Sequence, residues 1–347
     1  MTRRARRPAF TELAARLAAE FPRARLDPTV VAWADQAPAR VRWGVAFSGG
    51  ADSLALLLLV WAHWPGRRRR LRVLHFDHRL RGKAAQADAR FCRAVCRALG
   101  VEFVAGAWRD ARSDASEAEA RAARLAFLAR HARVLWFGHQ QDDIAESLLM
   151  RLARGSGTGG LAAPRPVQRL PRERVHLRPL LTLKKAELVA ALRAAGAAWC
   201  EDASNAGDRY FRNRIRRSVV PPWQAAAQRD ALAGAARSRM LLEEDDTALE
   251  AWLASLNVFG ARGALQLRRL AGKPRALWRR ALHRWLAQEP RAGEISRVAF
   301  ETLLAALESG RRTRHSLGRQ GFAVLDGRAL RFEPAGKARR KFHGPAN

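Results

Sequence analysis

The sequence predicts an α/β protein in which a Rossmann-like, doubly wound parallel sheet is followed by a smaller, mainly helical region that ends in a β-hairpin. Three observations support this fold class. Short apolar strand patterns alternate with helical patterns through the first two-thirds of the 347 residues. The first strand joins an apolar helix through Ser-Gly-Gly-Ala-Asp-Ser at residues 48–53. Near the carboxyl end, Asp326-Gly327 separates two further strand patterns, which is typical of a two-residue hairpin.

The alternation defines the elements of the sheet. Strands are predicted over residues 41–47, 71–76, 101–104 and 134–137, and helices over 53–61, 84–99, 116–131, 142–154 and 184–195. Gly100 ends the second helix, and Ser116 with Glu119 forms a capping box at the start of the third. Because strands separated by helices pair in parallel through right-handed crossovers, a ligand is expected beyond the carboxyl ends of the strands.

The remaining sequence is less regular. Residues 155–160 are expected to form a flexible glycine-rich loop, and the Pro-rich run 164–179 carries little regular structure beyond 175–177. After Pro221-Pro222 the chain becomes rich in Ala, Leu and Arg, so helices are predicted over 223–256, 276–287 and 296–307, and the hairpin strands over 322–325 and 328–332. The predicted domains are therefore 1–222 and 223–335, followed by a basic, disordered tail over 336–347.

Charge is the unusual feature of the composition. The chain carries 64 Lys+Arg against 32 Asp+Glu, a net charge of +32. This excess predicts a polyanionic partner, and nucleic acid is favoured over a membrane because no long uncharged apolar run is present. The alternative is a compositional bias toward Arg and Ala without a binding role. Charged residues follow the N-terminal arginines, which argues against a secretory signal.

The three cysteines, Cys92, Cys96 and Cys200, are an odd and small set that indicates reduced thiols in a cytoplasmic protein. Cys92 and Cys96 are one helical turn apart and could share a metal. We interpret them instead as small packing residues, because no further ligands stand nearby at metal spacing.

The turn at residues 48–53 has the composition of a phosphate cradle. Gly49 and Gly50 can adopt φ > 0, and a helix opening at Asp52 or Ser53 offers unpaired N–H groups to an anion. The lysine-containing Walker pattern is absent. The predicted nucleotide-binding residues are Ser48, Gly49, Gly50, Ala51, Asp52 and Ser53. The alternative is an ordinary helix start with Asp52 or Ser53 as its N-cap.

Other polar motifs follow the second and fourth strands. In His-Phe-Asp-His, His75 and His78 lie on opposite strand faces, so nucleotide contact or loop ordering is favoured over metal binding. Asp143 and Glu146 share one face in a first helical turn, where a nearby triphosphate would require Mg²⁺ or a cationic substrate. The alternative is that these acids only satisfy the helix dipole. Aromatic residues and arginines interleave over 199–217, which suits recognition of phosphate or carboxylate.

These motifs together resemble the tRNA(Ile)-lysidine synthase family of the PP-loop ATP pyrophosphatases, a group with the adenine nucleotide α-hydrolase-like fold. The resemblance covers about residues 41–221. It is carried by S-G-G-A-D-S, H-F-D-H-R-L-R, E-x-x-A-R-x-x-R, the run 138–161, R-P-L-L, W-C-E-D-A-S-N and R-N-R-I-R. Leu125 stands where the family often has tyrosine, and the chain after residue 222 matches only loosely.

The resemblance implies a carbon–nitrogen ligase with ATP and Mg²⁺ as cofactors, and with L-lysine and tRNA(Ile) bearing a CAU anticodon as partners. ATP would adenylate the C2 oxygen of the first anticodon cytidine, and the lysine side-chain amine would then displace AMP. The implied catalytic residues are Asp52, His139, Asp143, Glu146, Arg121, Arg212 and Arg214, with His75 beside the nucleotide and Asp52 and Asp143 at the metal. The sequence leaves the oligomeric state open, a homodimer included.

Two other functions are compatible with parts of the sequence. A PP-loop cytidine thiolase would need thiolates or an iron–sulfur cluster at the cleft, whereas Cys92 and Cys96 lie in the middle of a predicted helix. A non-catalytic, basic RNA-binding protein would keep the nucleotide-binding fold, but its RNA function would not depend on Asp52 or Asp143.

Overall fold

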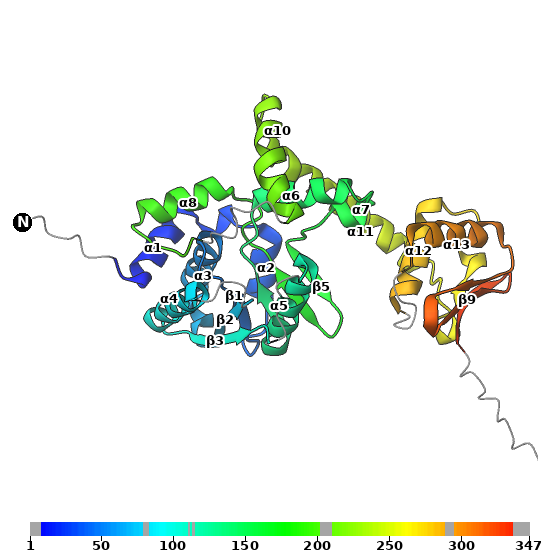
Figure 1. The fold of residues 1–347 in the computed structure, drawn as a ribbon, viewed down its shortest axis with the longest axis horizontal. Coiled ribbons are helices and arrows are strands. Elements are labelled where there is room, and N and C mark those ends of the chain that lie inside the picture. Colours follow the sequence, from blue (N-terminus) through cyan, green and yellow to red (C-terminus); the bar gives the residue numbers. More distant parts are fainter. Residues whose placement is uncertain are drawn as a thin grey trace, which may run out of the picture. The chain divides into compact units, whose positions relative to one another are not determined.

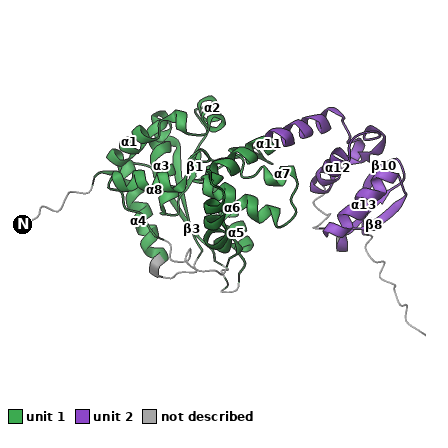
Figure 2. Ribbon diagram, turned by 90° about the horizontal axis from the view of Figure 1, so that it is seen from above, with its two compact units in different colours: residues 1–243 green, residues 244–347 purple. Residues whose placement is uncertain are grey.

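The computed structural model describes residues 8–78, 83–109, 112, 115–201, 210–288 and 295–335. The chain forms two compact units, Met1–Glu243 and Glu244–Asn347 (Figures 1 and 2). The predicted tail over 336–347 lies outside the described residues. In the part of the chain that is described, no helix combines the length and apolarity needed to cross a bilayer.

The sheet of the first unit has six strands in the order β3-β2-β1-β4-β6-β5. These strands are β1 (Trp43–Ala46), β2 (Leu71–Asp77), β3 (Glu102–Ala107), β4 (Val134–Trp136), β5 (Val167–Leu170) and β6 (Arg174–Leu177). The pairs β3–β2, β2–β1, β1–β4 and β4–β6 are parallel, and β5 pairs antiparallel with β6 at one edge. The predicted doubly wound parallel sheet is therefore confirmed, with one additional antiparallel strand.

Helices cover both faces of this sheet. The helices α1 (Phe10–Glu20), α3 (Ala51–His63), α4 (Lys83–Leu99) and α8 (Lys185–Ala194) share one core with β1 and β2. On the other face, α5 (Glu117–His131) packs through Phe127 and Leu128. α2 (Pro28–Gln36) contacts β5. The N-terminal helices α1 and α2 were not among the predicted elements.

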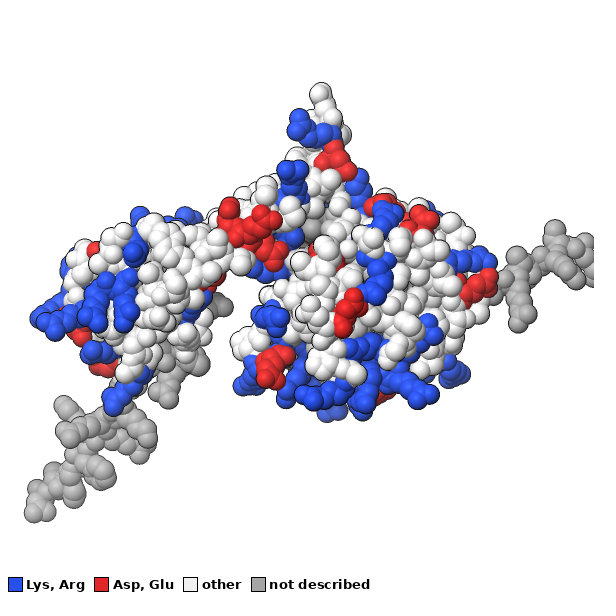
Figure 3. All heavy atoms as spheres, turned by 180° about the vertical axis from the view of Figure 1, so that it is seen from behind, with Lys and Arg blue, Asp and Glu red and all other residues white. Residues whose placement is uncertain are grey.

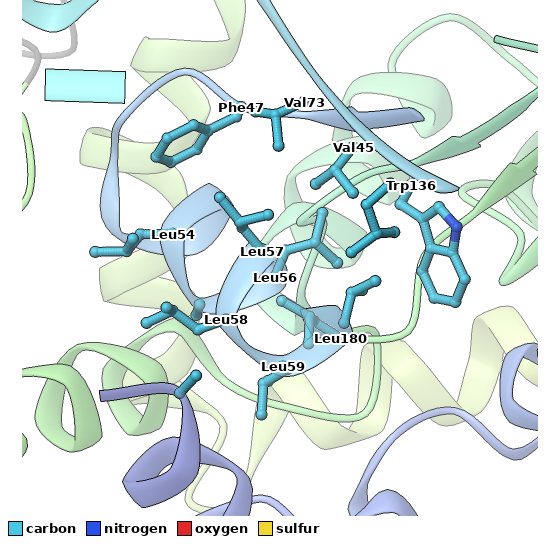
Figure 4. Packing of buried hydrophobic residues seen from close by; sticks show 14 of the residues in the cluster. Val45, Phe47, Leu54, Leu56, Leu57, Leu58, Leu59, Val73, Trp136 and Leu180 are labelled. Carbon is cyan, nitrogen blue, oxygen red and sulfur yellow. The ribbon is translucent and has the colours of Figure 1, made fainter. Parts of the chain in front are cut away.

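The helix that follows the glycine turn is the centre of the core. Every residue of α3 from Leu54 to Val60 is buried, so α3 is apolar on all sides and packs inside the unit (Figure 4). Leu56 and Leu57 lie toward Val45 of β1 and Phe47 (Figure 4). This packing fixes the start of α3, and hence the glycine turn, against the carboxyl end of β1.

The predicted helix starts and stops are largely confirmed. Ser116 Oγ accepts a hydrogen bond from Glu119 N at 3.2 Å while Glu119 Oε2 accepts one from Ser116 N at 2.8 Å, which is the predicted capping box. Gly100 follows α4 with φ of +65°. Within the predicted glycine loop, Thr158–Leu161 forms a short helix, α7.

The two compact units divide later in the chain than the boundary predicted after residue 222. α6 (Gln141–Leu152), α9 (Phe211–Arg214), a π-helical turn (Ile215–Val219), α10 (Val220–Ala226) and the first half of α11 (Ala231–Ser255) share a separate cluster of buried side chains. Its members are Ile144, Ala145, Leu181, Ile215, Val220, Leu232 and Ala235. This cluster ties α10 and the start of α11 to the first unit.

The second unit combines two helices with a small antiparallel sheet. α12 (Arg275–Gln288) and α13 (Arg297–Ser309) pack with β7 (Leu265–Gln266), β8 (Thr313–Ser316), β9 (Gly321–Leu325) and β10 (Ala329–Pro334), which are ordered β7-β10-β9-β8. Asp326 Oδ1 accepts hydrogen bonds from the N–H groups of Arg328 and Ala329, each at 2.9 Å. Gly327 has φ of +87°. The predicted hairpin is confirmed, whereas β7 and β8 were not predicted.

Candidate active site

The turn between β1 and α3 forms an open helix N-terminus. Gly50 is the N-cap, and no side chain of this residue accepts a hydrogen bond from the first N–H groups of α3. The helix begins at Ala51, one or two residues before the predicted start at Asp52 or Ser53. Of the two glycines, Gly49 adopts the left-handed region with φ of +94°, whereas Gly50 has φ of −74°. This geometry suits an anion.

Two hydroxyl groups hold the turn in shape. Ser53 Oγ accepts a hydrogen bond from Ser48 N at 3.2 Å and donates one to Gly50 O at 3.0 Å. Ser48 Oγ lies 3.1 Å from Ser53 Oγ. The turn is thus closed by residues five positions apart, without any charged side chain.

Three residues that are distant in the sequence, His75, Cys92 and Cys200, pack against the backbone of the turn or of the residue before it. His75 is buried at the end of β2, and its Nδ1 lies 2.9 Å from Phe47 O. Cys200 N donates to Gly49 O at 2.9 Å. A Cβ atom on Gly49 would lie 3.1 Å from Cys200 Sγ and 3.2 Å from Cys92 Sγ. His75 therefore contacts the backbone that enters the glycine turn, and Cys92 packs against Gly49 as a small buried residue.

Asp52 is the carboxylate that belongs to the turn. Its Oδ1 is buried and has no hydrogen-bond partner among the described residues, and its Oδ2 lies 3.9 Å from Lys185 Nζ. Burial raises the pKa of Asp52 to about 6, although Lys185 opposes the shift. An unpartnered carboxylate oxygen beside a phosphate cradle fits Mg²⁺, which commonly takes one or two carboxylates together with substrate phosphates and water.

Asp143 is differently placed. Gln140 N donates to its Oδ2 at 3.0 Å, and Arg212 Nη2 lies 2.5 Å from its Oδ1. Both oxygens are engaged by protein donors, so the predicted metal role fits Asp52 better than Asp143. Burial raises the pKa of Asp143, while the Arg212 charge opposes the shift.

Asp143 and Glu146 lie on one face of α6, as their spacing predicts, and form a buried cluster with two arginines. Arg212 Nε lies 2.7 Å from Glu146 Oε2, and Arg216 Nε lies 2.5 Å from Glu146 Oε1. Arg216 Nη2 adds a contact of 3.0 Å to Oε2. Only 1% of Glu146 is exposed. Sequence reasoning identified Arg212 but assigned no role to Arg216, although both lie in the R-N-R-I-R motif.

His139 follows β4 and meets a second arginine that sequence reasoning did not select. Arg178 Nε donates to His139 Nδ1 at 3.1 Å, and the imidazole stacks on Phe137 at 5.7 Å. Burial, together with Arg178 and three further arginines, holds the pKa of His139 well below its ordinary value. Gly138 is in close contact with α3, since a Cβ there would lie 2.7 Å from Asp52 O. The His139 segment therefore adjoins the glycine turn.

The remaining predicted arginines are distributed around this cluster. Desolvation and repulsion from Arg212 lower the pKa of Arg121, which lies on α5. Arg124, one turn further along α5, has a buried Nε without a hydrogen-bond partner, and burial lowers its pKa to about 10. Arg214 is exposed, with its guanidinium 5.6 Å from the Phe211 ring centroid. Arg121 and Arg124 on α5 are therefore within electrostatic range of Arg212, and Arg124 belongs to the E-x-x-A-R-x-x-R motif but was not among the predicted site residues.

Parts of two motifs cannot be placed. Residues 79–81 of H-F-D-H-R-L-R, together with Gly82, and residues 202–209, which include most of E-D-A-S-N, lie outside the described residues. Among the residues that are described, no group of three or more His, Cys, Asp or Glu side chains is arranged to hold a metal ion. Basic side chains are prominent on the surface of both units (Figure 3).

Comparison with known proteins identifies the family. The PP-loop domain family matches residues 28–223. Three proteins named tRNA(Ile)-lysidine synthase are similar to the chain. The protein from Nitratidesulfovibrio vulgaris is 41% identical over 193 residues, covering 51% of this chain and 53% of its own. The protein from Geobacter sulfurreducens is 36% identical, covering 74% of this chain and 56% of its own. The protein from Rhodopseudomonas palustris is 37% identical, covering 76% of this chain and 79% of its own.

The chain thus spans about half the length of the first two relatives and most of the third. The residues matched by the PP-loop domain family, 28–223, include the glycine turn and the α6 carboxylates. On this match and on the similarity to the Rhodopseudomonas palustris protein, the chain belongs to the tRNA(Ile)-lysidine synthase family of PP-loop proteins.

Proposed function

We propose that this chain joins L-lysine to C2 of the first anticodon cytidine of tRNA(Ile) bearing a CAU anticodon. The observation that carries this proposal is the open glycine turn, with the unpartnered Asp52 oxygen beside it, next to the buried carboxylates of α6. The cytosine O2 attacks the α-phosphorus of ATP and releases pyrophosphate. The lysine side-chain amine then attacks C2, the bond from C2 to the adenylyl oxygen breaks, and AMP leaves.

The first step requires a site that holds the leaving pyrophosphate. The N–H groups at the start of α3 and the Ser48 and Ser53 hydroxyls would bind its oxygens. Asp52 would hold Mg²⁺, and a bound Mg²⁺ supplies charge neutralisation for the phosphates. Because the base must leave its stack to reach this site, part of the binding energy is used to unstack it.

The second step requires a deprotonated amine. The Asp143 and Glu146 carboxylates were expected to attract the lysine ammonium group, but Arg212 and Arg216 already neutralise them. An ammonium group can pair with Asp143 only if Arg212 moves away. With its pKa raised by burial, Asp143 is suited to accept a proton from the amine once Arg212 has moved.

The test uses ATP, Mg²⁺, radiolabelled lysine and two transcripts with the same anticodon. Label is expected in tRNA(Ile) with the CAU anticodon and not in tRNA(Met). Pyrophosphate should appear in equal amount with incorporated lysine. Absence of label from both transcripts, with the protein folded and ATP bound, would contradict the proposal.

The thiolase alternative is disfavoured by the burial of Cys92 and Cys96. Cys92 and Cys96 are fully buried, and burial raises the pKa of Cys96 to about 12 and that of Cys92 beyond the ordinary range. Such thiols resist ionisation, whereas sulfur transfer requires thiolates or a cluster. Sulfide-dependent labelling of tRNA without lysine would favour the thiolase, and tRNA binding without pyrophosphate release would favour a non-catalytic RNA-binding protein.

A further inference from the structure

Arg178 is a buried arginine whose guanidinium group donates to three protein acceptors. Only 5% of the residue is exposed. Its Nη1 donates to Arg165 O at 2.7 Å, its Nη2 donates to Gln168 Oε1 at 2.9 Å, and its Nε lies 3.1 Å from His139 Nδ1. The contacts with Arg165 O, just before β5, and with Gln168 of β5 orient the guanidinium group. They thereby fix the direction in which Arg178 Nε points at His139.

The pairing of β4 with β6 places Arg178 beside His139. β4 and β6 are parallel neighbours with Trp136 opposite Leu177, and Phe137 N donates to Leu177 O at 2.9 Å. The residues just beyond the two strands therefore lie side by side. The Phe137 ring stacks on His139 with an interplanar angle of 19°, and its centroid lies 5.6 Å from the Arg178 guanidinium carbon. One aromatic ring thus supports both partners.

The contact determines where the imidazole carries its proton. A guanidinium group has five N–H donors and no acceptor, so His139 Nδ1 must offer a lone pair. The single proton of the neutral ring is then on Nε2. A doubly protonated ring would place an N–H group against the Arg178 N–H group and one positive charge against another.

Other charges near His139 act in the same direction. Arg212, Arg124 and Arg121 also disfavour a positive imidazole, and burial adds to their effect. Asp143 follows on the same segment, but Arg212 and Gln140 engage its two carboxylate oxygens. The surroundings therefore favour a neutral ring.

We propose that Arg178 is a positioning residue that holds His139 as the neutral Nε2–H tautomer, so that His139 serves the substrate as a hydrogen-bond donor and not as a proton acceptor. The tautomer follows from the contacts alone, and its use rests on the function proposed above. In that reaction the acceptor is an oxygen of the adenylyl phosphate or of the base. Removal of the amine proton is then left to a carboxylate, and Asp143 is the group suited to it.

The tautomer can be measured in the full-length protein without nucleotide, lysine or tRNA. Histidine labelled with ¹⁵N reports the protonation of each ring nitrogen by NMR, and the His139 signals are assigned by their loss in His139→Gln. We expect the pattern of a neutral ring with the proton on Nε2 at neutral pH. If the wild-type protein carries the proton on Nδ1 of His139, or carries a doubly protonated ring, the proposal is wrong.

Variants then test the role of Arg178. Arg178→Met removes the donor, so we expect a mixture of tautomers and a rise of the His139 pKa toward its ordinary value. Arg174→Met is the matched control, because Arg174 lies on β6 and donates through Nε to Pro171 O at 3.3 Å. The control should keep the wild-type pattern. A folded Arg178→Met variant with the wild-type pattern overturns the positioning role.

A second variant covers the case in which Arg178→Met fails to fold. Gln168→Ala removes only the acceptor of Arg178 Nη2, so it should loosen the guanidinium and give a detectable second tautomer. An unchanged tautomer in that variant contradicts the role assigned to the contact network. The measurement uses no substrate, so it can confirm the His139 tautomer even if the lysine-transfer function is wrong. A wrong tautomer would likewise leave the lysine-transfer function untouched.

Discussion

The two sides of the candidate site are built differently. On the glycine-turn side, residues 48–53 hydrogen-bond to one another, and no charged side chain is needed to close the turn. On the α6 side, Glu146 depends on Arg212 and Arg216, which lie 66 and 70 residues further along the chain. A local cradle made of backbone and hydroxyl groups is thus combined with a buried charge cluster that exists only in the folded chain.

The difference has an energetic consequence. A hydroxyl-closed turn tolerates loss of one neutral hydrogen bond at a cost of about 1 kcal/mol. A buried ion cluster does not tolerate loss of one partner, because the remaining charges stay desolvated and unpaired. Substitutions on the two sides should therefore differ in their effects on activity and stability.

Asp52→Asn should reduce pyrophosphate release on the order of 10³-fold or more, because a metal at the phosphates supplies several kcal/mol of transition-state stabilisation. Binding of tRNA, measured by filter retention, should be nearly unchanged. Asp35→Asn is the control, since Asp35 lies on α2 and its carboxylate bonds to Trp64 Nε1 at 3.0 Å, away from the turn. Full activity of Asp52→Asn would show that the turn does not use this carboxylate.

Glu146→Gln should destabilise the protein by about 3 kcal/mol, because Arg212 and Arg216 lose a buried counter-charge. Urea unfolding measures this loss. The matched control is Glu173→Gln, which removes the partner of Arg133 from a pair whose side chains are 86% and 74% exposed. The control should leave the free energy of unfolding nearly unchanged. Equal effects of the two substitutions would mean that the α6 cluster is not a closed, desolvated ion cluster.

Gly49→Ala should cost about 1–3 kcal/mol and weaken ATP binding, because φ is +94° and the new Cβ would meet two cysteine sulfurs. Gly66→Ala is the comparison, since a Cβ at Gly66 meets nothing within 4 Å. Thermal unfolding and nucleotide titration measure both variants. A Gly49→Ala protein as stable as Gly66→Ala would show that the turn can relax.

Asp52 should also make the metal-free protein less stable as pH rises. Its folded pKa is about 6, above the ordinary value of 3.8, so the folded state holds the proton more tightly and stability falls between about pH 4 and pH 6. Asp52→Asn should be more stable than wild type above pH 6 by about 1–3 kcal/mol, and the gain should vanish near pH 4. Unfolding curves in chelator across this range measure it. A pH-independent difference would contradict the raised pKa.

The sequence predicted the local features well. The capping box at Ser116, the hairpin at Asp326-Gly327 and the glycine turn each depend on residues within a few positions of one another. Features set by tertiary packing were missed. β5 lies in the Pro-rich run, but Pro166 and Pro171 flank the strand and no proline lies inside it. α1 and α2 were also not predicted, although Asp27 caps α2 and Pro28 begins it, which is a local signal.

The missed site residues have the same cause. Arg178, Arg216 and Lys185 each meet a partner that is distant in the sequence, and their spacing to that partner carries no signal. The motifs R-P-L-L and R-N-R-I-R contain Arg178 and Arg216, but a motif does not say which of its arginines faces inward. The register of β4 with β6 places Arg178, and the π-helical turn Ile215–Val219 places Arg216.

The proposed function depends on the glycine turn binding the β- and γ-phosphates so that the adenylyl group passes to the tRNA base. The direct test is incubation with ATP labelled at the α-phosphate, Mg²⁺ and tRNA(Ile), first without lysine. The claim predicts label bound covalently to the tRNA together with free pyrophosphate, and release of the label as AMP when lysine is added. Cleavage of ATP to ADP and phosphate, with no label on the tRNA, would contradict it.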